Sequence, residues 1–533
     1  MIGVIAAGHT RTADAGAQML RRGGNAVDAA VAAAFMSFIS EAGLVNIGGG
    51  GIAMVVDPQT GQNSVYDFFS NMPGVGLSGS FPPKNMDFRR VLIDFGPAQQ
   101  PFYIGRASVA VPGAVAGLCK MLEEQGTLPL ATVLEPAIIG AQEGVVLTHF
   151  QAYTLSLLLR ILTDTPRIRK IFSPGGNVAE VGQRLAFPAL AKTLEQLGHD
   201  GAALFYTGAV GDRIVVDQRA HGGLITRADL AAYEVRRMPP IEVEYRGYRA
   251  LIPRPSSGGG VLIAFALHLL NTVSLEGIKR GSYAHLRILI EIMRFTNIAR
   301  AAWNNSGSNI DIVRGFLDTE RIEFYAEQLK RALATESSPP DAPTPPTHPN
   351  TSHLSVADAN GMVVSMTTSA GENAGFVVAD TGVMLNNMLG EIDLHPNGFH
   401  RFTPGKRLST MMSPVVVLKD GQPVLAVGSG GSNRLRTAIL QVISNVCDFG
   451  LPLNEAIDAS RIHFEDNVTQ LEGGVEKQAA NLLDDAGYTT NRWPYRNMFF
   501  GGVHSVALEQ DAQGKRWVAH GDRRREGTAL VVA

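Results

Sequence analysis

Residues 351–369 read TSHLSVADANGMVVSMTTS, and this stretch holds two extended runs on either side of a turn. Apolar residues dominate 354–357 and 363–367, and Ala-Asn-Gly lies between them, which is the pattern of a β-hairpin. The preceding residues, 336–350, contain six prolines among fifteen positions and predict an extended, unpacked linker. Regular structure is therefore expected to begin abruptly at Thr351.

The rest of the chain predicts sheets that carry helices on their outer faces. Two helices are expected at 11–22 and 26–40, separated by the turn and capping residues Gly23-Gly24-Asn25. Helical patterns predict further helices at 114–124, 131–143, 189–197, 261–270, 283–303, 434–448 and 474–486. Further strands are expected within 52–69, at 241–251, and at 414–418, 424–427 and 503–508. Both parts of the chain supply strands and amphipathic helices, which favours a layered α+β architecture.

Composition excludes several classes of protein. Of 533 residues, 45% are hydrophobic and 18% are charged, and the net charge is −3 without any long run of like charges. Binding to nucleic acid or to a membrane surface therefore lacks electrostatic support. Cys119 and Cys447 lie in no metal-binding spacing, so we expect no metal site, and one disulfide between them stays open. The N-terminus lacks a signal-peptide pattern, which predicts a cytoplasmic protein, or a periplasmic one if the start is truncated.

Glycine clusters are the first chemical candidates. The cluster at 48–51 formally fits a dinucleotide-binding loop, but a strand pattern follows it instead of a helix, so we interpret it as a glycine strand entry. A second cluster, GSGGSN at 428–433, lies between a strand and a helix. Its backbone N–H groups can bind a carboxylate or an oxyanion, and a plain strand-to-helix turn is the alternative.

Thr351 is the candidate nucleophile. A hydroxyl reacts poorly without a base nearby, whereas an N-terminal threonine carries its own base, the α-amine. If the chain is cleaved between Asn350 and Thr351, the new α-amine, with a pKa of about 8, can accept the hydroxyl proton. The unpacked linker would then let the old chain end leave the site. An ordinary threonine at a strand edge is the alternative, since threonine is common there.

Taken together, the motifs resemble those of the γ-glutamyltranspeptidases, a family of N-terminal nucleophile hydrolases. In chain order they are GGNAVDAAVA (23–32), IGGGG (47–51), VPGAVAGL (111–118), GGLITRADLAAYE (222–234), PRPSSGGG (253–260), TSHLSVADANGMVVSMT (351–367), LNN (385–387), PGKRLSTMMSP (404–414), GSGGSNR (428–434) and SRIHFE (460–465). The resemblance implies a four-layer αββα sandwich, made as one interlocked precursor over 1–533. It also implies self-cleavage into a large subunit, 1–350, and a small catalytic subunit, 351–533, without a cofactor.

The resemblance also implies roles for individual residues. By position, these are Thr351 as nucleophile, Ser369 as its hydrogen-bond partner, Gly430 and Gly431 at the oxyanion, Ser409 and Thr410 at the substrate carboxylate, and His353 in packing. The two oxyanion glycines are placed by a GSGGS sequence where the family usually has GSPGG.

The positions that hold the glutamyl group depart from the family pattern. A stretch that resembles DFRE in the family reads Asp67-Phe68-Phe69-Ser70 here, so an arginine is missing and Phe69 becomes a candidate for an apolar acyl pocket. Among residues 388–391, only Glu391 is suited to receive an ammonium group, and Gly371 replaces a family asparagine. The candidates to replace the missing arginine are Arg106, Arg434 and Arg436.

These residues predict an autoprocessed amidase or acyltransferase with a threonine nucleophile. Its substrate would be a γ-glutamyl-type amide such as glutathione, with the acyl group passed to water or to an amine. The missing arginine and the short loop after Glu391 favour a glutaryl-type or other side-chain acylase as the alternative. A third hypothesis is an uncut, non-catalytic binding protein. The expected partners are a small amide substrate and the two subunits, without nucleic acid or membrane, and a homo-oligomer is left open.

Overall fold

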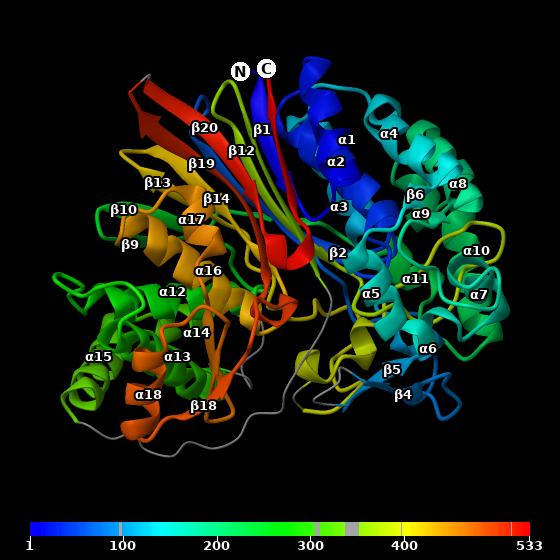
Figure 1. Ribbon diagram of the computed structural model, residues 1–533. Helices are drawn as coiled ribbons and strands as arrows, with labels where there is room; N and C mark the ends of the chain where they lie inside the picture. Colours follow the sequence, from blue (N-terminus) through cyan, green and yellow to red (C-terminus); the bar gives the residue numbers. More distant parts are fainter. Residues whose placement is uncertain (95–98, 304–309, 336–350, 396, 513) are drawn as a thin grey trace.

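Two seven-stranded sheets lie face to face in the structure, and helices cover both outer faces (Figure 1). The structure is a computed structural model that describes residues 1–94, 99–303, 310–335, 351–395, 397–512 and 514–533. Strands from before and after the proline-rich stretch take part in both sheets. The proline-rich stretch itself, 336–350, lies outside the described residues.

The first sheet has the predicted hairpin at its centre. In spatial order its strands are β21 (Thr528–Val532), β1 (Gly3–Ala7), β11 (Ser352–Asp358), β12 (Val363–Ser369), β2 (Gly50–Asp57), β3 (Gln62–Phe68) and β8 (Arg236–Met238), all antiparallel to their neighbours. The hairpin of β11 and β12 confirms the prediction for 351–369, and both strands are buried along their whole length. The glycine cluster at 48–51 does lead into a strand, β2.

The second sheet contains β15 (Ser429–Gly430), β19 (Gly502–Asp511), β14 (Gln422–Val427), β13 (Val415–Lys419), β10 (Tyr248–Ile252) and β9 (Ile241–Tyr245), with β20 (Gly514–Gly521) paired to β19. The strand pattern predicted at 241–251 is confirmed but divides into two strands, β9 and β10, because the chain turns back at Arg246 and Gly247. Both residues have positive φ, 54° and 77°, as a two-residue hairpin turn requires. An Arg-Gly pair is a weak turn signal, so the break was not visible in the sequence pattern.

Apolar side chains fill the space between the sheets. Val4, Ile52 and Met54 from the first sheet pack with Val416 and Val506 from the second, and all five are fully buried. Because successive strand residues point to opposite faces, the alternate residues of each strand face a helical layer instead. This alternation gives the molecule three stacked apolar interfaces.

The helices form two outer layers. The first sheet is covered by α1 (Thr10–Arg21), α2 (Ala26–Ser40), α3 (Ala114–Gln125), α4 (Leu130–Glu143), α5 (His149–Leu157), α6 (Leu159–Leu162), α7 (Pro166–Phe172), α8 (Pro188–Asp200), α9 (Ala203–Tyr206), α10 (Ala209–Ala220) and α11 (Arg227–Ala231). The second is covered by α12 (Gly258–Asn271), α13 (Tyr283–Trp303), α14 (Ile310–Phe316), α15 (Thr319–Ala334), α16 (Arg434–Cys447), α17 (Leu453–Asp458) and α18 (Lys477–Asp485). The predicted four-layer αββα sandwich is therefore confirmed.

Helix α2 is the innermost helix of its layer. Asn25 caps it by accepting hydrogen bonds from the backbone N–H groups of Val27 and Asp28, and the Asp28 carboxylate accepts in return from Asn25. Every residue of α2 is buried, which explains its apolar sequence.

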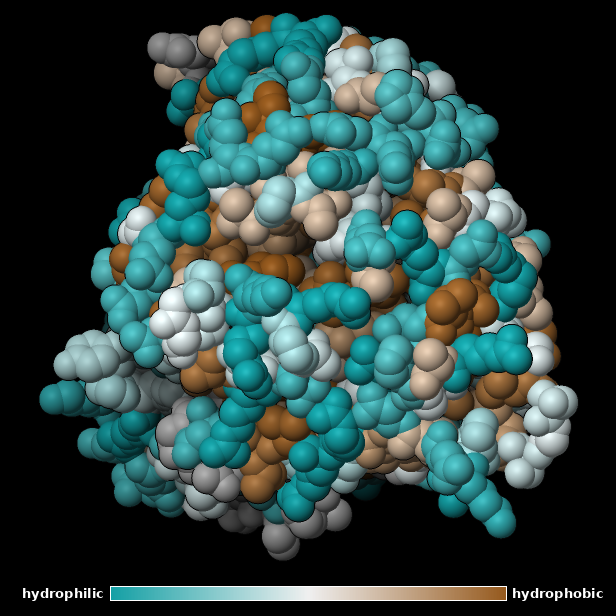
Figure 2. Space-filling model, turned by 90° about the vertical axis from the view of Figure 1, so that its right-hand side faces the viewer, coloured by the Kyte–Doolittle hydropathy of each residue, from teal (hydrophilic) through white to brown (hydrophobic). Residues whose placement is uncertain are grey.

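Among the described residues, no helix is long and apolar enough to cross a membrane. Figure 2 shows the outer face that carries α8 and α10, where hydrophilic residues dominate.

Smaller elements complete the fold. They are β4 (Arg89–Asp94), β5 (Gln99–Ile104), β6 (Val145–Val146), β7 (Arg184–Leu185), β16 (Ile462–Glu465), β17 (Val468–Leu471) and β18 (Thr489–Arg492). Cys119 and Cys447 are both free, so the disulfide left open by the sequence is not formed. The division into subunits at residue 350 stays a prediction.

Candidate active site

A small cavity of about 30 Å³ lies at the end of the central hairpin. Its lining comes from distant parts of the chain: Phe69, Thr351, Ser369, Met388, Glu391, Asp393, Leu394, Thr410, Met411, Met412, Ser432 and Leu435. Five of these residues were predicted from the sequence as site residues: Thr351, Ser369, Glu391, Thr410 and Phe69. The structure thus gathers the predicted nucleophile and most predicted substrate contacts in one place.

The hairpin itself brings Thr351 and Ser369 together. Thr351 directly precedes β11, Ser369 ends β12, and Ser352 faces Thr368 in the ladder, so Thr351 and Ser369 occupy the next facing positions. Both side chains are buried and line the cavity. The Ser369 hydroxyl accepts a hydrogen bond from the Gly371 backbone N–H at 3.1 Å. The two side chains therefore lie close together, and the hydrogen bond between Thr351 and Ser369 stays a prediction.

The second glycine cluster packs directly against Thr351. A Cβ atom added to Gly430 would lie only 2.2 Å from the Thr351 carbonyl oxygen, so no other residue fits there without displacement. Gly431 has a φ of 121°, a backbone conformation that favours glycine. The turn connects β15 to α16, and its backbone lies against the hairpin end; its role at an oxyanion stays a prediction.

Glu391 is a buried carboxyl group at the cavity wall. Its side chain is hydrogen-bonded to Glu372 and Asn387, and burial together with the Glu372 charge raises the pKa of Glu391 well above its ordinary value. A Cβ atom on Gly371 would lie 2.1 Å from Asn387 Oδ1 and 2.7 Å from Glu391 Oε1. The volume that a side chain at position 371 would need is therefore already occupied by these two groups.

The two candidate contacts for a substrate carboxylate lie at different depths. Thr410 lines the cavity, and its backbone N–H donates to the Ser256 carbonyl at 2.9 Å. The Ser409 hydroxyl donates to the same Ser256 carbonyl at 3.3 Å, and Ser409 lies outside the cavity lining. Only Thr410 of the pair therefore contacts the cavity in this conformation.

The three arginines considered as replacements lie outside the cavity lining. Arg106 is ion-paired with Asp217, with Nε 3.1 Å from Oδ2, and stacks over the Phe376 ring. The Arg434 Nε donates to the Phe499 carbonyl at 2.9 Å, and burial lowers the pKa of Arg434 to about 10. Arg436, also buried, donates to Asn297. Among the described lining residues the ionisable side chains are Glu391 and Asp393, both carboxylic acids.

Of the remaining candidate residues, one lines the cavity and the others are buried in the core. Phe69 lines the cavity, whereas Phe68 packs against Gly51 and Gly117 in the core. His353 is buried and hydrogen-bonded to the Thr367 and Ser355 hydroxyls at 2.9 and 3.0 Å. Burial holds the pKa of His353 well below its ordinary value, so the ring is neutral at pH 7 and its position is a packing position.

Sequence reasoning missed several residues of the site. Asp393 lines the cavity and accepts a hydrogen bond from the Ser432 hydroxyl at 3.2 Å, which links the loop after Glu391 to the glycine turn. Glu372 follows Gly371 directly, and Asn387 is the last residue of the LNN motif. The place of Asn387 in the LNN motif and the place of Glu372 beside Gly371 could have pointed to these two residues. No motif pointed to Asp393.

Comparisons with known proteins agree with this geometry. The model of the family described as gamma-glutamyltranspeptidase matches residues 12–532. The acylase ACY 1 proenzyme of Pseudomonas sp. (strain V22) is 32% identical over 523 residues, which cover 96% of this chain and 90% of that relative. The glutathione hydrolase proenzyme of Escherichia coli (strain K12) is 29% identical over 504 residues, covering 91% and 85%.

Solved structures of related acylases and transpeptidases have the same fold. The cephalosporin acylase from Bacillus halodurans superimposes with a TM-score of 0.84 at 25% identity, covering 99% of this chain and 95% of that one. The gamma-glutamyltranspeptidase of Helicobacter pylori superimposes with a TM-score of 0.52 at 29% identity, covering 63% and 92%. The fold is thus that of the N-terminal nucleophile hydrolases, and the related proteins are hydrolases and acylases. With its family model matched from residue 12 to residue 532, this chain belongs to the gamma-glutamyltranspeptidase family.

Proposed function

We propose that this protein is an amidase or acyltransferase that cleaves itself before Thr351 and then uses Thr351 to attack a γ-glutamyl-type amide. One observation carries the proposal: Thr351 and Ser369 line one cavity at the end of the hairpin, and the backbone at Gly430 packs against the Thr351 carbonyl. A nucleophile, a hydroxyl that can orient it and backbone N–H groups for an oxyanion are the parts that acyl transfer needs. The E. coli and Pseudomonas relatives, which carry the name proenzyme, support the self-cleavage.

The reaction follows from these positions. Thr351 Oγ attacks the amide carbonyl carbon, and its proton passes to the Thr351 α-amine. Backbone N–H groups of the glycine turn stabilise the negative charge on the former carbonyl oxygen. The C–N bond then breaks, the leaving amine takes the proton from the α-ammonium, and the acyl group remains as an ester on Thr351. Water or a second amine attacks this ester and releases Thr351 with its hydroxyl restored.

Mass analysis of the purified protein tests the self-cleavage before any substrate is chosen. We expect two fragments, one of which begins Thr351-Ser352-His353, and the other of which ends at residue 350. N-terminal sequencing of each fragment identifies the broken bond directly. A single uncut chain would support the binding-protein hypothesis instead.

The two fragments are expected to stay together after cleavage. In the first sheet β11 faces β1 along five residue pairs, and β12 faces β2 along seven. Backbone hydrogen bonds of these two ladders join the two fragments. The apolar layer between the sheets is shared in the same way. Size-exclusion chromatography should give one peak that contains both fragments, and denaturant should be needed to part them. Separate peaks in native buffer would contradict this arrangement.

The lining of the cavity bears on which acyl group the substrate carries. The ionisable cavity lining is acidic, which favours a substrate that carries an ammonium group, as a γ-glutamyl amide does, over a glutaryl amide that carries only a carboxylate. A second candidate is an acylase for an apolar acyl group. Phe69, Met388, Leu394 and Leu435 give the cavity an apolar wall that suits it, and the similarity to acylase ACY 1 supports it.

Glu391→Gln separates these substrates. With γ-glutamyl-p-nitroanilide, loss of a charged hydrogen-bond partner should raise KM by about tenfold or more, while an apolar acyl anilide should be cleaved as before. In the wild type, KM for the γ-glutamyl substrate should fall as pH rises, since burial and Glu372 raise the pKa of Glu391 and ionisation is needed to attract the ammonium. The variant should lack this dependence.

The matched control is Glu476→Gln, which changes an exposed carboxylate paired with Lys279 far from the cavity lining. It should leave both substrates unaffected. Equal KM values for the γ-glutamyl substrate in wild type and Glu391→Gln would remove Glu391 from substrate binding and favour the apolar acyl group.

A further inference from the structure

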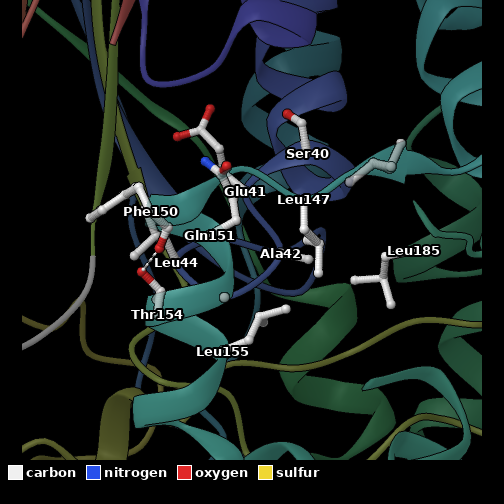
Figure 3. Close-up of a pocket in the computed structure, with 12 residues that line it drawn as sticks. Ser40, Glu41, Ala42, Leu44, Leu147, Phe150, Gln151, Thr154, Leu155 and Leu185 are labelled. Atoms are coloured by element: carbon white, nitrogen blue, oxygen red, sulfur yellow. Dashed lines mark hydrogen bonds between the residues drawn. The ribbon is translucent and has the colours of Figure 1, made fainter. Parts of the chain in front are cut away.

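Glu41 is a fully buried carboxyl group that the proposed reaction does not use. It caps the C-terminal end of α2, 2% exposed, and accepts two hydrogen bonds: from the Ser352 hydroxyl at 2.6 Å and from the Thr12 hydroxyl at 2.8 Å. Figure 3 shows its carboxyl pointing away from Leu147, Leu155 and Leu185, which form an apolar wall beside α2. The carboxyl is thus directed to the strand that begins at the nucleophile.

The first residues of β11, Ser352 and His353, have no facing residue in β1. The ladder between β1 and β11 ends where Ala7 faces Leu354, so Ser352 and His353 extend beyond the last residue of β1. At Gly8 the chain leaves the sheet, and a Cβ atom there would lie 2.3 Å from Glu41 Oε2. The Glu41 carboxyl therefore occupies the place beside β11 that the next residues of β1 would have taken.

A buried cation holds the same stretch from another element. Arg525, in the short 3₁₀ helix Arg523–Arg525 near the C-terminus, donates from Nη1 to the Thr351 carbonyl at 2.8 Å. Arg525 is 4% exposed and interacts electrostatically with Glu41. The buried Arg525 guanidinium and the buried Glu41 carboxyl group thus hold two consecutive groups, the Thr351 carbonyl and the Ser352 hydroxyl.

Such an anchor matters because of the proposed cleavage. Chain ends fray unless they are tied down, and Thr351 would become a chain end that must hold its α-amine and hydroxyl in a fixed direction. Side chains alternate along a strand, so Ser352 points to the opposite face from Thr351. Glu41 consequently lies outside the cavity lining and can act only through the position of the strand.

We infer, on the basis of the proposed function, that Glu41 is a positioning residue for the nucleophile: through Ser352, and with Arg525 on the Thr351 carbonyl, it holds the start of β11. Loss of this link should leave the substrate pocket intact and misdirect Thr351. The effect should therefore fall on kcat and leave KM within about twofold, because a shift of about 1 Å at a reacting group costs up to about 100-fold in rate.

The test uses the full chain with Glu41→Gln, Ser352→Ala and the double variant. Each should be cut, and each should show kcat lowered by about tenfold or more at nearly unchanged KM. The double variant should be no slower than the worse single variant, since both changes break one link. Ser352→Thr keeps the hydroxyl and should restore kcat, which a loss of packing volume alone would not explain.

Thr12→Val is the matched control. It removes the other hydroxyl donor of the same carboxyl group but leaves the link to Ser352, so its kcat should stay near the wild-type value. Ser352→Ala with wild-type kcat, or additive losses in the double variant, would overturn the inference. Both results require a wild-type protein that is cut and active. If the wild type itself is uncut or inactive, the proposed function has failed, and the two failures are therefore distinguishable.

If Glu41→Gln or Ser352→Ala is expressed but stays uncut, the melting temperature decides the meaning. An uncut Ser352→Ala chain that melts like the uncut Thr351→Ala chain, with Ser352→Thr cut normally, places the same positioning requirement at the self-cleavage step and supports the inference. An uncut chain that melts much lower shows that the link serves stability alone, and the inference fails.

Discussion

Thr351→Ala should give a single uncut chain of 533 residues without measurable turnover. The substitution removes the only hydroxyl at the predicted cleavage bond, so neither the peptide carbonyl before residue 351 nor a substrate carbonyl can be attacked from this position. The methyl side chain fits the space of threonine, and the fold should persist. Denaturing electrophoresis and intact mass report the cleavage, and release of p-nitroaniline from γ-glutamyl-p-nitroanilide reports turnover.

Thr351→Ser is the matched control, because it keeps the hydroxyl and removes only a methyl group. It should be cut and active, more slowly than the wild type, since a buried methyl group that helps fix the rotamer is lost. A Thr351→Ala chain that is still cut before residue 351, or still turns over, would show that another group is the nucleophile. Ser369, the other hydroxyl at the hairpin end, would then be the next residue to change.

Local pattern was enough to predict most of the fold. The hairpin at 351–369 carries strand residues around an Asn-Gly turn, and the helix at 434–448 carries its apolar residues with helical spacing. The helix at 26–40 is apolar nearly throughout and is marked by its capping residue, Asn25. The pattern failed at Arg246–Gly247, where backbone conformation and not hydropathy divides β9 from β10. Sheet order was also beyond the pattern, since β1 and β21 come from opposite ends of the chain and are neighbours.

Motif matching found the chemistry of the site but not its surroundings. Thr351 and the glycine turn lie within motifs, and Ser369 follows the motif of Thr351 by two residues. The structure brings Thr351 and Ser369 to one cavity and packs Gly430 against the Thr351 carbonyl. Arg434 ends the GSGGSNR motif and Arg436 follows it by two residues, yet their guanidinium groups bind other partners, the Phe499 carbonyl and Asn297. Glu41 and Ser352 are 311 positions apart, and only the folded sheet makes them partners.

The missing arginine is explained in part by what fills the space around it. Asp67 precedes the position, and its carboxylate lies 3.7 Å from the Nε of the buried Arg407. Arg407 also donates to the Tyr233 hydroxyl at 2.7 Å, so its charge is committed within the core. Phe69 takes the position of the missing arginine in the cavity lining, where the ionisable side chains among the described residues are Glu391 and Asp393.

Gly430→Ala is expected to have the second largest effect, a fall in kcat of about 100-fold or more with KM little changed. The added methyl carbon would lie 2.2 Å from the Thr351 carbonyl oxygen and 2.5 Å from Arg525 Nη1, both well inside contact distance. The Thr351 carbonyl is backbone, and Arg525 is buried, so the clash can be relieved only by moving the turn away from Thr351. That movement carries the N–H groups away from the developing oxyanion.

Steady-state kinetics on the cut protein separate this effect from general damage to the fold. Gly175→Ala is the matched control, because a Cβ atom there meets nothing within 4 Å and the backbone has no positive φ. It should keep wild-type kcat and melting temperature. If Gly430→Ala retained wild-type kcat, the turn would lie away from the reacting atoms, and the oxyanion would have to be stabilised by other donors. If it stayed uncut while keeping its melting temperature, the same turn would be needed at the first acyl transfer, the attack of Thr351 on its own chain.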